Sequence, residues 1–218
     1  MIRQLILTED GSHTIFVPEM GEHYHSVHGA MQESLHIFIQ HGFNQIQAKE
    51  LSILEIGFGT GLNALLTLLI SNADNKPVIY ETWEKFPLSS EEIRKLNYPE
   101  ILKCERSLYN SLHQAAWEIN VPITPIFTLR KIESDILNFH SDRIFDLVYF
   151  DAFGPDFQPE LWTAEVFSKI AACQRKGSRL VTYSAKGQVR RNLREAGYMV
   201  EKAPGPPGKR EITIAIKT

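Results

Sequence analysis

Apolar runs with the length of buried strands alternate with segments of helical periodicity from residue 51 to residue 217. Short apolar runs bounded by turn residues are typical of covered strands, whereas apolar residues three and four apart are typical of helices. The alternation predicts an α/β fold, with a doubly wound, mostly parallel sheet. The expected strands are 51–56, 78–83, 123–132, 145–151, 179–184, 199–203 and 211–217. The expected helices are 62–71, several between 89 and 119, a short one after Asp135, 159–172 and 188–196.

The two ends of the chain depart from this regular pattern. The segment 204–210 is rich in Pro and Gly and too short for a helical crossover, so the last two strands should pair antiparallel. Residues 1–45 are expected to form a small extension packed on the domain 46–218, with a hairpin followed by a helix over 30–41. Three roles are open for the extension: a lid, a wall of the substrate pocket, or padding for the sheet.

Three glycines, Gly57, Gly59 and Gly61, join the strand 51–56 to the following apolar helix. Glycine at such a turn lets a ligand approach bare backbone. A dinucleotide fingerprint has glycines at its first, third and sixth positions, but the sixth position here is Leu62. The spacing therefore favours S-adenosylmethionine over a dinucleotide, and a turn without any ligand is the remaining alternative.

Carboxylates follow three of the other expected strands, where ligands bind in sheets of this kind. Glu84 is placed to accept hydrogen bonds from ribose hydroxyls, with Glu81 as a rival inside the strand. Asp135 is placed to bind the adenine amino group while Ile136 packs on the ring, although an Asp there also suits a helix N-cap. Asp151 ends the strand 145–151 and is expected to converge with these two carboxylates and the glycine loop.

Composition excludes several classes of protein. A hydrophobic share of 43% with 22% charged residues is ordinary for a globular domain, not for a disordered or fibrous chain. The longest apolar run is far shorter than the ~20 residues of a membrane-spanning helix, and no signal-peptide layout is present, so we expect a cytoplasmic protein. Cys104 and Cys173 lie far apart, and no Cys or carboxylate cluster completes the histidines 23, 25 and 28, so no metal is expected.

The net charge of −3 conceals an uneven distribution. The segment from Cys173 onward carries +8, and the preceding residues carry −11. A basic C-terminal surface on an acidic body suggests a polyanionic partner, and a solvated helix face is the alternative. The basic residues chosen for phosphate contact are Lys186, Arg190, Arg191, Arg194, Lys209 and Arg210.

Several blocks, taken together, resemble the MnmC/MnmD methyltransferases, which act on the wobble uridine of bacterial transfer RNA. The resemblance covers about residues 20–218 and rests on the blocks 54–63, 84–88, 150–155, 159–162, 184–193 and 208–211. It implies a Rossmann-like, class I S-adenosylmethionine-dependent enzyme. The implied reaction methylates the aminomethyl group of 5-aminomethyl-2-thiouridine in the anticodon stem-loop, giving 5-methylaminomethyl-2-thiouridine. The chain looks like the stand-alone MnmD form without the FAD oxidase domain, which implies that a separate enzyme supplies the aminomethyl uridine. In the block 150–155, Gly154 stands where the resemblance leads us to expect alanine.

The expected site combines residues of these blocks with Asp135 and Ile136, which follow the strand before them. The cofactor set is Glu55, Gly57, Phe58, Gly59, Thr60, Gly61, Asn63, Glu84, Lys85, Phe86, Asp135, Ile136 and Asp151. The remaining substrate candidates are Phe153, Pro155 and Trp162, of which the two aromatic residues could stack on the base or belong to the core.

The expected chemistry sets a task for Asp151. An alkyl amine has a pKa near that of lysine, about 10.4, so the acceptor arrives charged although methyl transfer needs a neutral nucleophile. Asp151 either receives the proton of this amine or only orients it by a hydrogen bond. The alternatives to the whole scheme are a methyltransferase for another amine, on a small molecule or a protein, a nicotinamide-dependent oxidoreductase, and a non-catalytic RNA-binding module.

Overall fold

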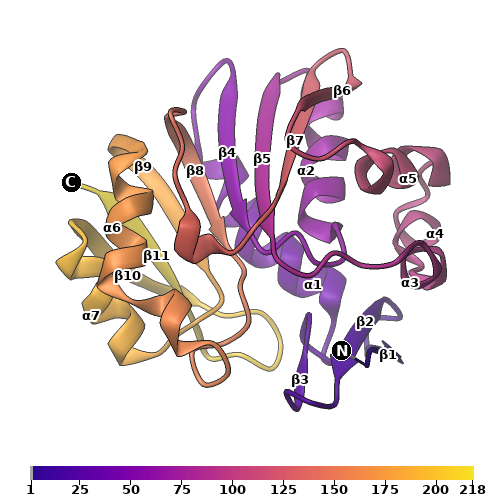
Figure 1. The fold of residues 1–218 in the computed structure, drawn as a ribbon, viewed down its shortest axis with the longest axis horizontal. Coiled ribbons are helices and arrows are strands. Elements are labelled where there is room, and N and C mark those ends of the chain that lie inside the picture. The colour runs from indigo at the N-terminus through magenta and orange to yellow at the C-terminus, as the bar shows by residue number, and fades with distance from the viewer. Residues whose placement is uncertain (1) are drawn as a thin grey trace.

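A computed structural model describes residues 2–218, which form a large sheet with flanking helices and a small N-terminal sheet (Figure 1). The large sheet has eight strands in the spatial order β10-β11-β9-β8-β4-β5-β7-β6. Its central strands are parallel, whereas β11 is antiparallel to β9 and β10, which confirms the predicted fold class. The strands are β4 (Leu51–Ile56), β5 (Val78–Glu84), β6 (Asn120–Thr124), β7 (Phe127–Glu133), β8 (Phe145–Phe150), β9 (Gln174–Thr182), β10 (Tyr198–Pro204) and β11 (Glu211–Lys217).

Helices cover both faces of the large sheet, with α2 on one face and α6 and α7 on the other (Figure 1). Successive residues of a strand point to opposite faces. In β8, Leu147 and Tyr149 accordingly join the core beneath α2, while Val148 and Phe150 join the core beneath α6 and α7. Burying one such side chain stabilises the fold by roughly 1.5–3 kcal/mol. The helices are α2 (Leu62–Ala73), α3 (Ser90–Lys95), α4 (Tyr98–Leu102), α5 (Arg106–Gln114), α6 (Ala164–Ala172) and α7 (Gly187–Glu195).

Two predicted elements are divided in the structure. The strand expected over 123–132 is wrong, because β6 and β7 form an antiparallel hairpin that turns at Pro125 and Ile126. Proline has no N–H for a strand ladder, which accounts for the turn. The helix expected over 159–172 is a short 3-10 turn, Pro159–Trp162, followed by α6, whose N-terminal amide Val166 is capped by the Thr163 hydroxyl.

The N-terminal segment forms its own sheet and then packs into the main core. Its elements are β1 (Gln4–Leu7), β2 (His13–Val17), β3 (Glu22–His23), α1 (Ala30–Ser34) and a π-helical segment, Leu35–Gln40. The predicted hairpin and helix are present, although the helix changes to π geometry halfway. Ile37 and Phe38 are fully buried in the core beneath α2. The division of the chain at residue 45 stays a prediction.

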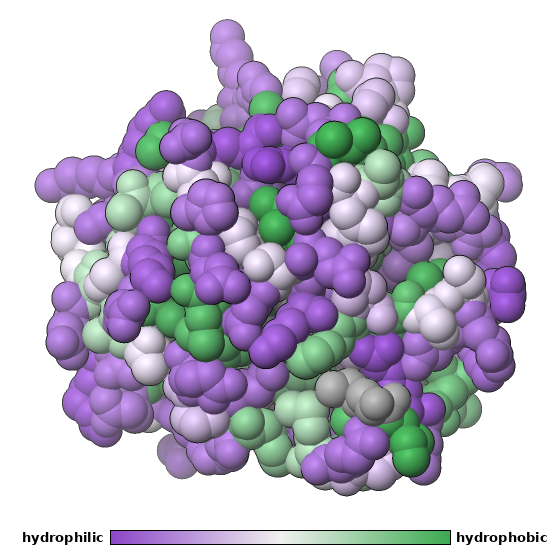
Figure 2. Space-filling view, viewed as in Figure 1, coloured by the Kyte–Doolittle hydropathy of each residue, from purple (hydrophilic) through white to green (hydrophobic). Residues whose placement is uncertain are grey.

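Hydrophilic side chains cover most of the face shown in Figure 2, with small separate hydrophobic patches between them. Among residues 2–218, none of the helices has both the length and the hydrophobicity that crossing a bilayer requires.

Candidate active site

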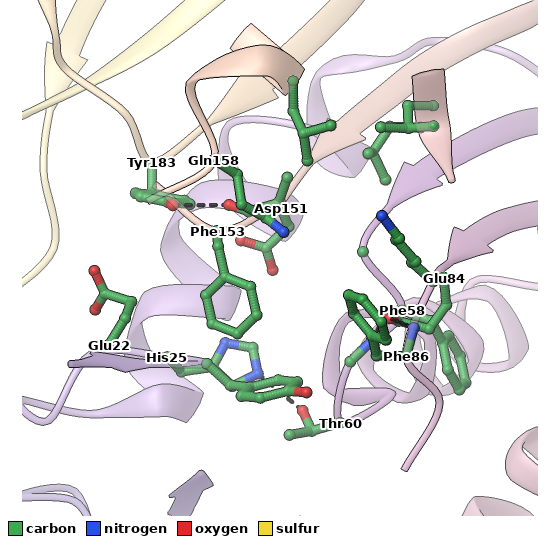
Figure 3. Close-up of a pocket in the computed structure, with 18 of the residues that line it drawn as sticks. Glu22, His25, Phe58, Thr60, Glu84, Phe86, Asp151, Phe153, Gln158 and Tyr183 are labelled. Atoms are coloured by element: carbon green, nitrogen blue, oxygen red, sulfur yellow. Dashed lines mark hydrogen bonds between the residues drawn. The ribbon is translucent and has the colours of Figure 1, made fainter. Parts of the chain in front are cut away.

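A cavity of about 440 Å³ opens beyond the carboxyl ends of β4, β5 and β8. This is the edge at which the strand order reverses, between β4 and β8, where open α/β sheets bind their ligands. Strand β3 and the residues after it, 22–27, form the other side of the cavity, so that residues far apart in sequence face one another across it (Figure 3).

The glycine loop forms one wall of the cavity. Gly57, Gly59 and Gly61 all have positive φ angles, of 90°, 50° and 71°, which other residues rarely adopt. A Cβ atom on Gly57 would lie 2.7 Å from the carbonyl oxygen of Asp151, and one on Gly61 would lie 2.8 Å from Nε2 of His113. Glycine is therefore required at these positions both by conformation and by space.

Glu84 lies at the end of β5 and bonds the loop to the next segment. Its Oε2 accepts a hydrogen bond from the Gly59 amide at 2.8 Å, and its Oε1 accepts one from the Phe86 amide at 2.7 Å. Lys85 forms an ion pair with Asp135, with 2.7 Å between Nζ and Oδ2. Of the two acidic residues considered for this position, Glu84 lines the cavity and Glu81 is fully buried in β5.

Asp135 both caps a 3-10 turn and lines the cavity. Its Oδ1 accepts a hydrogen bond from the Leu137 amide at 3.0 Å, and the next residue, Ile136, presents a nearly buried apolar side chain beside it. Burial alone would raise the pKa of Asp135, but the hydrogen bonds from Lys85 and Leu137 outweigh it and lower the pKa. The carboxylate is thus held ionised, and its contact with adenine stays a prediction.

Asp151 follows β8 and lines the cavity. Its amide donates to the Ile56 carbonyl at 2.9 Å, and its Oδ2 accepts a hydrogen bond from Nδ2 of Asn63 at 2.8 Å. Desolvation and the nearby Glu33 carboxylate raise the pKa of Asp151 well above its ordinary value, although the Asn63 amide acts in the opposite direction. A carboxylate with a raised proton affinity is suited to exchange a proton with a bound group.

The N-terminal segment supplies a wall that the sequence did not assign to particular residues. Tyr24 packs edge-on to Phe153, with 5.0 Å between ring centroids, and lies against Gly59. His25 is buried, and its Nε2 lies 2.8 Å from the Thr60 hydroxyl. Burial lowers the pKa of His25 to about 4, so the ring is neutral at neutral pH.

His23, His25 and His28 do not come together at one site. His23 packs against Phe16, while Nδ1 of His28 pairs with Glu9 at 3.0 Å on the surface. Within residues 2–218 there is no group of three or more His, Cys, Asp or Glu side chains placed to hold a metal ion.

Several expected site residues lie behind the cavity instead of on it. Glu55 and Asn63 are buried beneath the loop, where Glu55 accepts a hydrogen bond from the Thr82 hydroxyl at 2.9 Å. Desolvation raises the pKa of Glu55 to about 8. Trp162 is 2% exposed and donates from Nε1 to the Phe153 carbonyl at 2.8 Å, so it belongs to the core, the alternative left open for it.

The basic residues expected to face RNA are in three different situations. The exposed residues are Lys186, Arg191, Arg194 and Arg210, of which Lys186 pairs with Asp156. Arg190 is 6% exposed and pairs with Glu211 at 2.9 Å, so its guanidinium does not reach the surface. Lys209 lines the cavity and pairs with Glu33. The prediction of a surface contact for Arg190 is therefore corrected, because its charge is already neutralised inside the fold.

Comparison with known proteins decides between the possible cofactors. The model of a family described as S-adenosyl-L-methionine-dependent methyltransferase matches residues 89–218. The chain belongs to this family. The methyltransferase fold and its cofactor, S-adenosylmethionine, are thereby established, and the dinucleotide alternative is set aside.

Individual relatives of this methyltransferase have more specific names. It is 31% identical over 217 residues to the "tRNA 5-methylaminomethyl-2-thiouridine biosynthesis bifunctional protein MnmC" of Cupriavidus necator, covering 92% of this chain and 32% of that protein. The protein of the same name from Ralstonia nicotianae is 31% identical, covering 96% of this chain and 33% of that protein. The chain thus spans about a third of the length of these curated relatives. The crystal structure of MNMC2 from Aquifex aeolicus matches with a TM-score of 0.83 and 27% identity, covering 100% of this chain and 70% of that one.

The residues present fit S-adenosylmethionine. Gly57 and Gly59 line the cavity without side chains of their own, as a ligand lying along the loop requires, and the Tyr24 ring packs beside Gly59. Glu84 and Asp135 line the cavity with carboxylates, which are suitable acceptors for ribose hydroxyls and an adenine amino group, and Phe58, Phe86 and Ile136 add apolar surface. The individual roles of these residues stay predictions.

Proposed function

We propose that this methyltransferase N-methylates the aminomethyl group of 5-aminomethyl-2-thiouridine in the anticodon stem-loop of transfer RNA. The observation that carries the proposal is a carboxylate, Asp151, set between the glycine loop and a wall of aromatic and charged side chains. The names of the bacterial relatives support the same acceptor.

The cofactor, Asp151 and Phe153 have different roles in the proposed reaction. When bound, S-adenosylmethionine supplies a methyl group as the electrophile. Asp151 orients the acceptor amine, because the Asn63 amide holds its carboxylate in place, and it takes up the proton of the amine, as its raised pKa allows. Phe153, half-buried and facing the cavity, offers a flat surface to an extruded base, as expected for single-stranded RNA.

The proposal assigns RNA backbone contact to exposed basic residues near the cavity. Lys186, Arg191 and Arg194 lie at or on α7, and Arg210 follows Lys209, which itself lines the cavity. Phosphate contacts by such side chains give affinity that falls steeply with salt. Transfer RNA as the substrate also implies a cytoplasmic location. Because the substrate must already carry the aminomethyl group, the proposal requires a separate enzyme to make it.

The test is an acceptor assay with labelled methyl donor. Transfer RNA from cells lacking this methyltransferase, bulk protein and a set of small primary amines are offered separately. Label should enter only the RNA, and mass spectrometry of its nucleosides should show 5-methylaminomethyl-2-thiouridine replacing the aminomethyl form. Label entering the small amines or protein, with the RNA unmodified, would refute the proposal.

A further inference from the structure

An ion pair is enclosed in the acceptor side of the cavity. Nζ of Lys209 lies 2.7 Å from Oε1 of Glu33, and the other oxygen of Glu33 accepts a hydrogen bond from the Ser26 amide at 2.8 Å. The Glu33 side chain is 7% exposed and that of Lys209 is 29% exposed. Nζ of Lys209 also lies 4.1 Å from the centre of the Tyr183 ring, which holds the ammonium in place.

This pair is electrically coupled to Asp151. Glu33 raises the pKa of Asp151 and Lys209 lowers it, so both charges act on the carboxylate that meets the acceptor. The three residues come from α1, from the end of β8 and from the loop before β11, and all of them line the same cavity. The arrangement is not needed to hold S-adenosylmethionine, whose loop lies at Gly57 and Gly59.

The acceptor presents a problem that this arrangement addresses. A primary alkyl ammonium between two carboxylates would be held in its charged form, because a nearby opposite charge stabilises an ion. The charged form has no free electron pair and cannot be methylated. A cation beside the acceptor has the opposite effect and favours the neutral amine.

We propose that Lys209 is a positioning residue of the acceptor site, which balances Glu33 so that the acceptor amine is bound in its neutral form. The inference rests on the proposed function and adds to it the residues that set the protonation state of the substrate. Lys209 is thereby moved from the set of phosphate contacts to the acceptor pocket.

The reaction balances with this assignment. The acceptor ammonium gives one proton to Asp151, and the resulting neutral nitrogen forms a bond to the methyl carbon. The carbon–sulfur bond breaks with its electron pair on sulfur, so that S-adenosylhomocysteine and a secondary ammonium are the products. Asp151 then releases the proton to solvent, and no oxidant or further reactant is needed.

Other titratable groups face the same region and belong to the charge balance. Glu22 and His25 come from the N-terminal segment, Tyr183 follows β9, and Asp156 lies in the loop after β8. The His25 ring is neutral above its pKa of about 4, and burial keeps the pKa of Tyr183 well above its ordinary value. Neither changes charge near neutral pH. Glu55, buried behind the cavity, has a pKa of about 8 and also raises the pKa of Asp151, but it is the same in every variant compared. The Glu33–Lys209 pair is therefore the element to perturb.

The experiment measures kcat/KM against pH with transfer RNA that carries 5-aminomethyl-2-thiouridine. Lys209→Gln leaves the negative charge of Glu33 unbalanced, which stabilises the charged form of the amine. The rise of kcat/KM with pH should therefore shift to higher pH by about one unit. At neutral pH kcat/KM should fall about tenfold, and it should recover in alkali. Glu33→Gln leaves the cation unbalanced and should shift the rise to lower pH. Lys209→Arg keeps the charge and should leave the rise in place.

Two controls separate this role from a structural one. Affinity for S-adenosylhomocysteine, measured by calorimetry, should stay unchanged in all three variants. Lys202→Gln removes another lysine paired with a glutamate, on the exposed side of β10, and should leave the profile unmoved. Glu33→Gln keeps an acceptor for the Ser26 amide, so it decides the question alone if the Lys209 variants do not fold.

The outcomes distinguish the inference from the proposed function. The inference alone is overturned if Lys209→Gln and Glu33→Gln still methylate the RNA and their pH profiles are unmoved. It is also overturned if both profiles move in the same direction. Absence of transfer to this RNA by the wild-type protein refutes the proposed function itself.

Discussion

Gly57→Ala tests whether the loop after β4 is shaped for the cofactor. Gly57 has a φ angle of 90°, and a Cβ atom there would lie 2.7 Å from the carbonyl oxygen of Asp151 and 3.2 Å from its carbonyl carbon. Both atoms are backbone, so no side chain can swing away to make room. The loop and the residue after β8 must instead move apart.

The expected cost has two parts. A non-glycine residue in a left-handed conformation costs roughly 1–2 kcal/mol. Forcing an extra methyl group into a packed site costs typically a further 1–3 kcal/mol. The free energy of unfolding should therefore fall by about 2–5 kcal/mol, and the melting temperature by about 2–4 °C for each kcal/mol in a chain of this length. Displacing the loop should also weaken S-adenosylhomocysteine binding at least tenfold, or about 1.4 kcal/mol.

Gly177→Ala is the matched control. Gly177 lies in β9 with a φ angle of 87°, and a Cβ atom there would meet no atom within 4 Å. It should show the conformational cost alone, with unchanged affinity for S-adenosylhomocysteine. Calorimetric titration and chemical denaturation of both variants give the comparison. If Gly57→Ala matches Gly177→Ala in stability and binds the product as the wild type does, the argument for the loop is refuted.

Three further predictions concern single groups of the site and its surroundings. Asp151→Asn should keep S-adenosylhomocysteine affinity and lose about 10²–10⁴ in turnover, and wild-type turnover would remove its role as proton acceptor. Neutralising Arg191 and Arg194 together should weaken transfer RNA binding and lessen its salt dependence in filter-binding assays, whereas Arg190→Gln should mainly lower the melting temperature because it leaves Glu211 without its buried partner. The pKa of Glu55 is about 8 in the folded protein against an ordinary 4.5, so the folded state binds more protons than the unfolded state between these values. The free energy of unfolding therefore falls as the pH rises from about 4.5 to about 8. Glu55→Gln removes this dependence, and urea denaturation should show it gaining stability over the wild type between pH 5 and pH 8.

The central sheet and the loop could be predicted because their signals are local. The strand 51–56 was predicted at both of its ends, since an apolar run bounded by turn residues leaves little choice. Glu84 and Asp151 were placed together because parallel strands bring their carboxyl ends to one edge. The hairpin at Pro125 was missed, although the proline itself was the signal that could have revealed it.

The acceptor wall could not be predicted in the same way. Tyr24 and Glu33 meet Phe153 and Lys209 through contacts between residues more than 100 positions apart, which no periodicity records. The burial of Arg190 was also hard to predict, because its partner Glu211 lies on another element. Its spacing of three from the buried Leu193 is nevertheless a sign that it faces inward.

The uneven charge of the chain agrees with the proposed reaction. In that reaction both reactants arrive as cations, a sulfonium and an alkyl ammonium, which an acidic cavity attracts before the acceptor loses its proton. Six carboxylates and two lysines line it: Glu22, Glu33, Glu84, Asp135, Asp151 and Glu160, with Lys85 and Lys209. Each lysine is paired with one carboxylate, which leaves an acidic excess around Asp151. All six carboxylates come from the part of the chain with a charge of −11, whereas the part with +8 carries the exposed Arg191, Arg194 and Arg210. An acidic cavity beside a basic surface is what an enzyme requires when its cationic reacting group is attached to a polyanion.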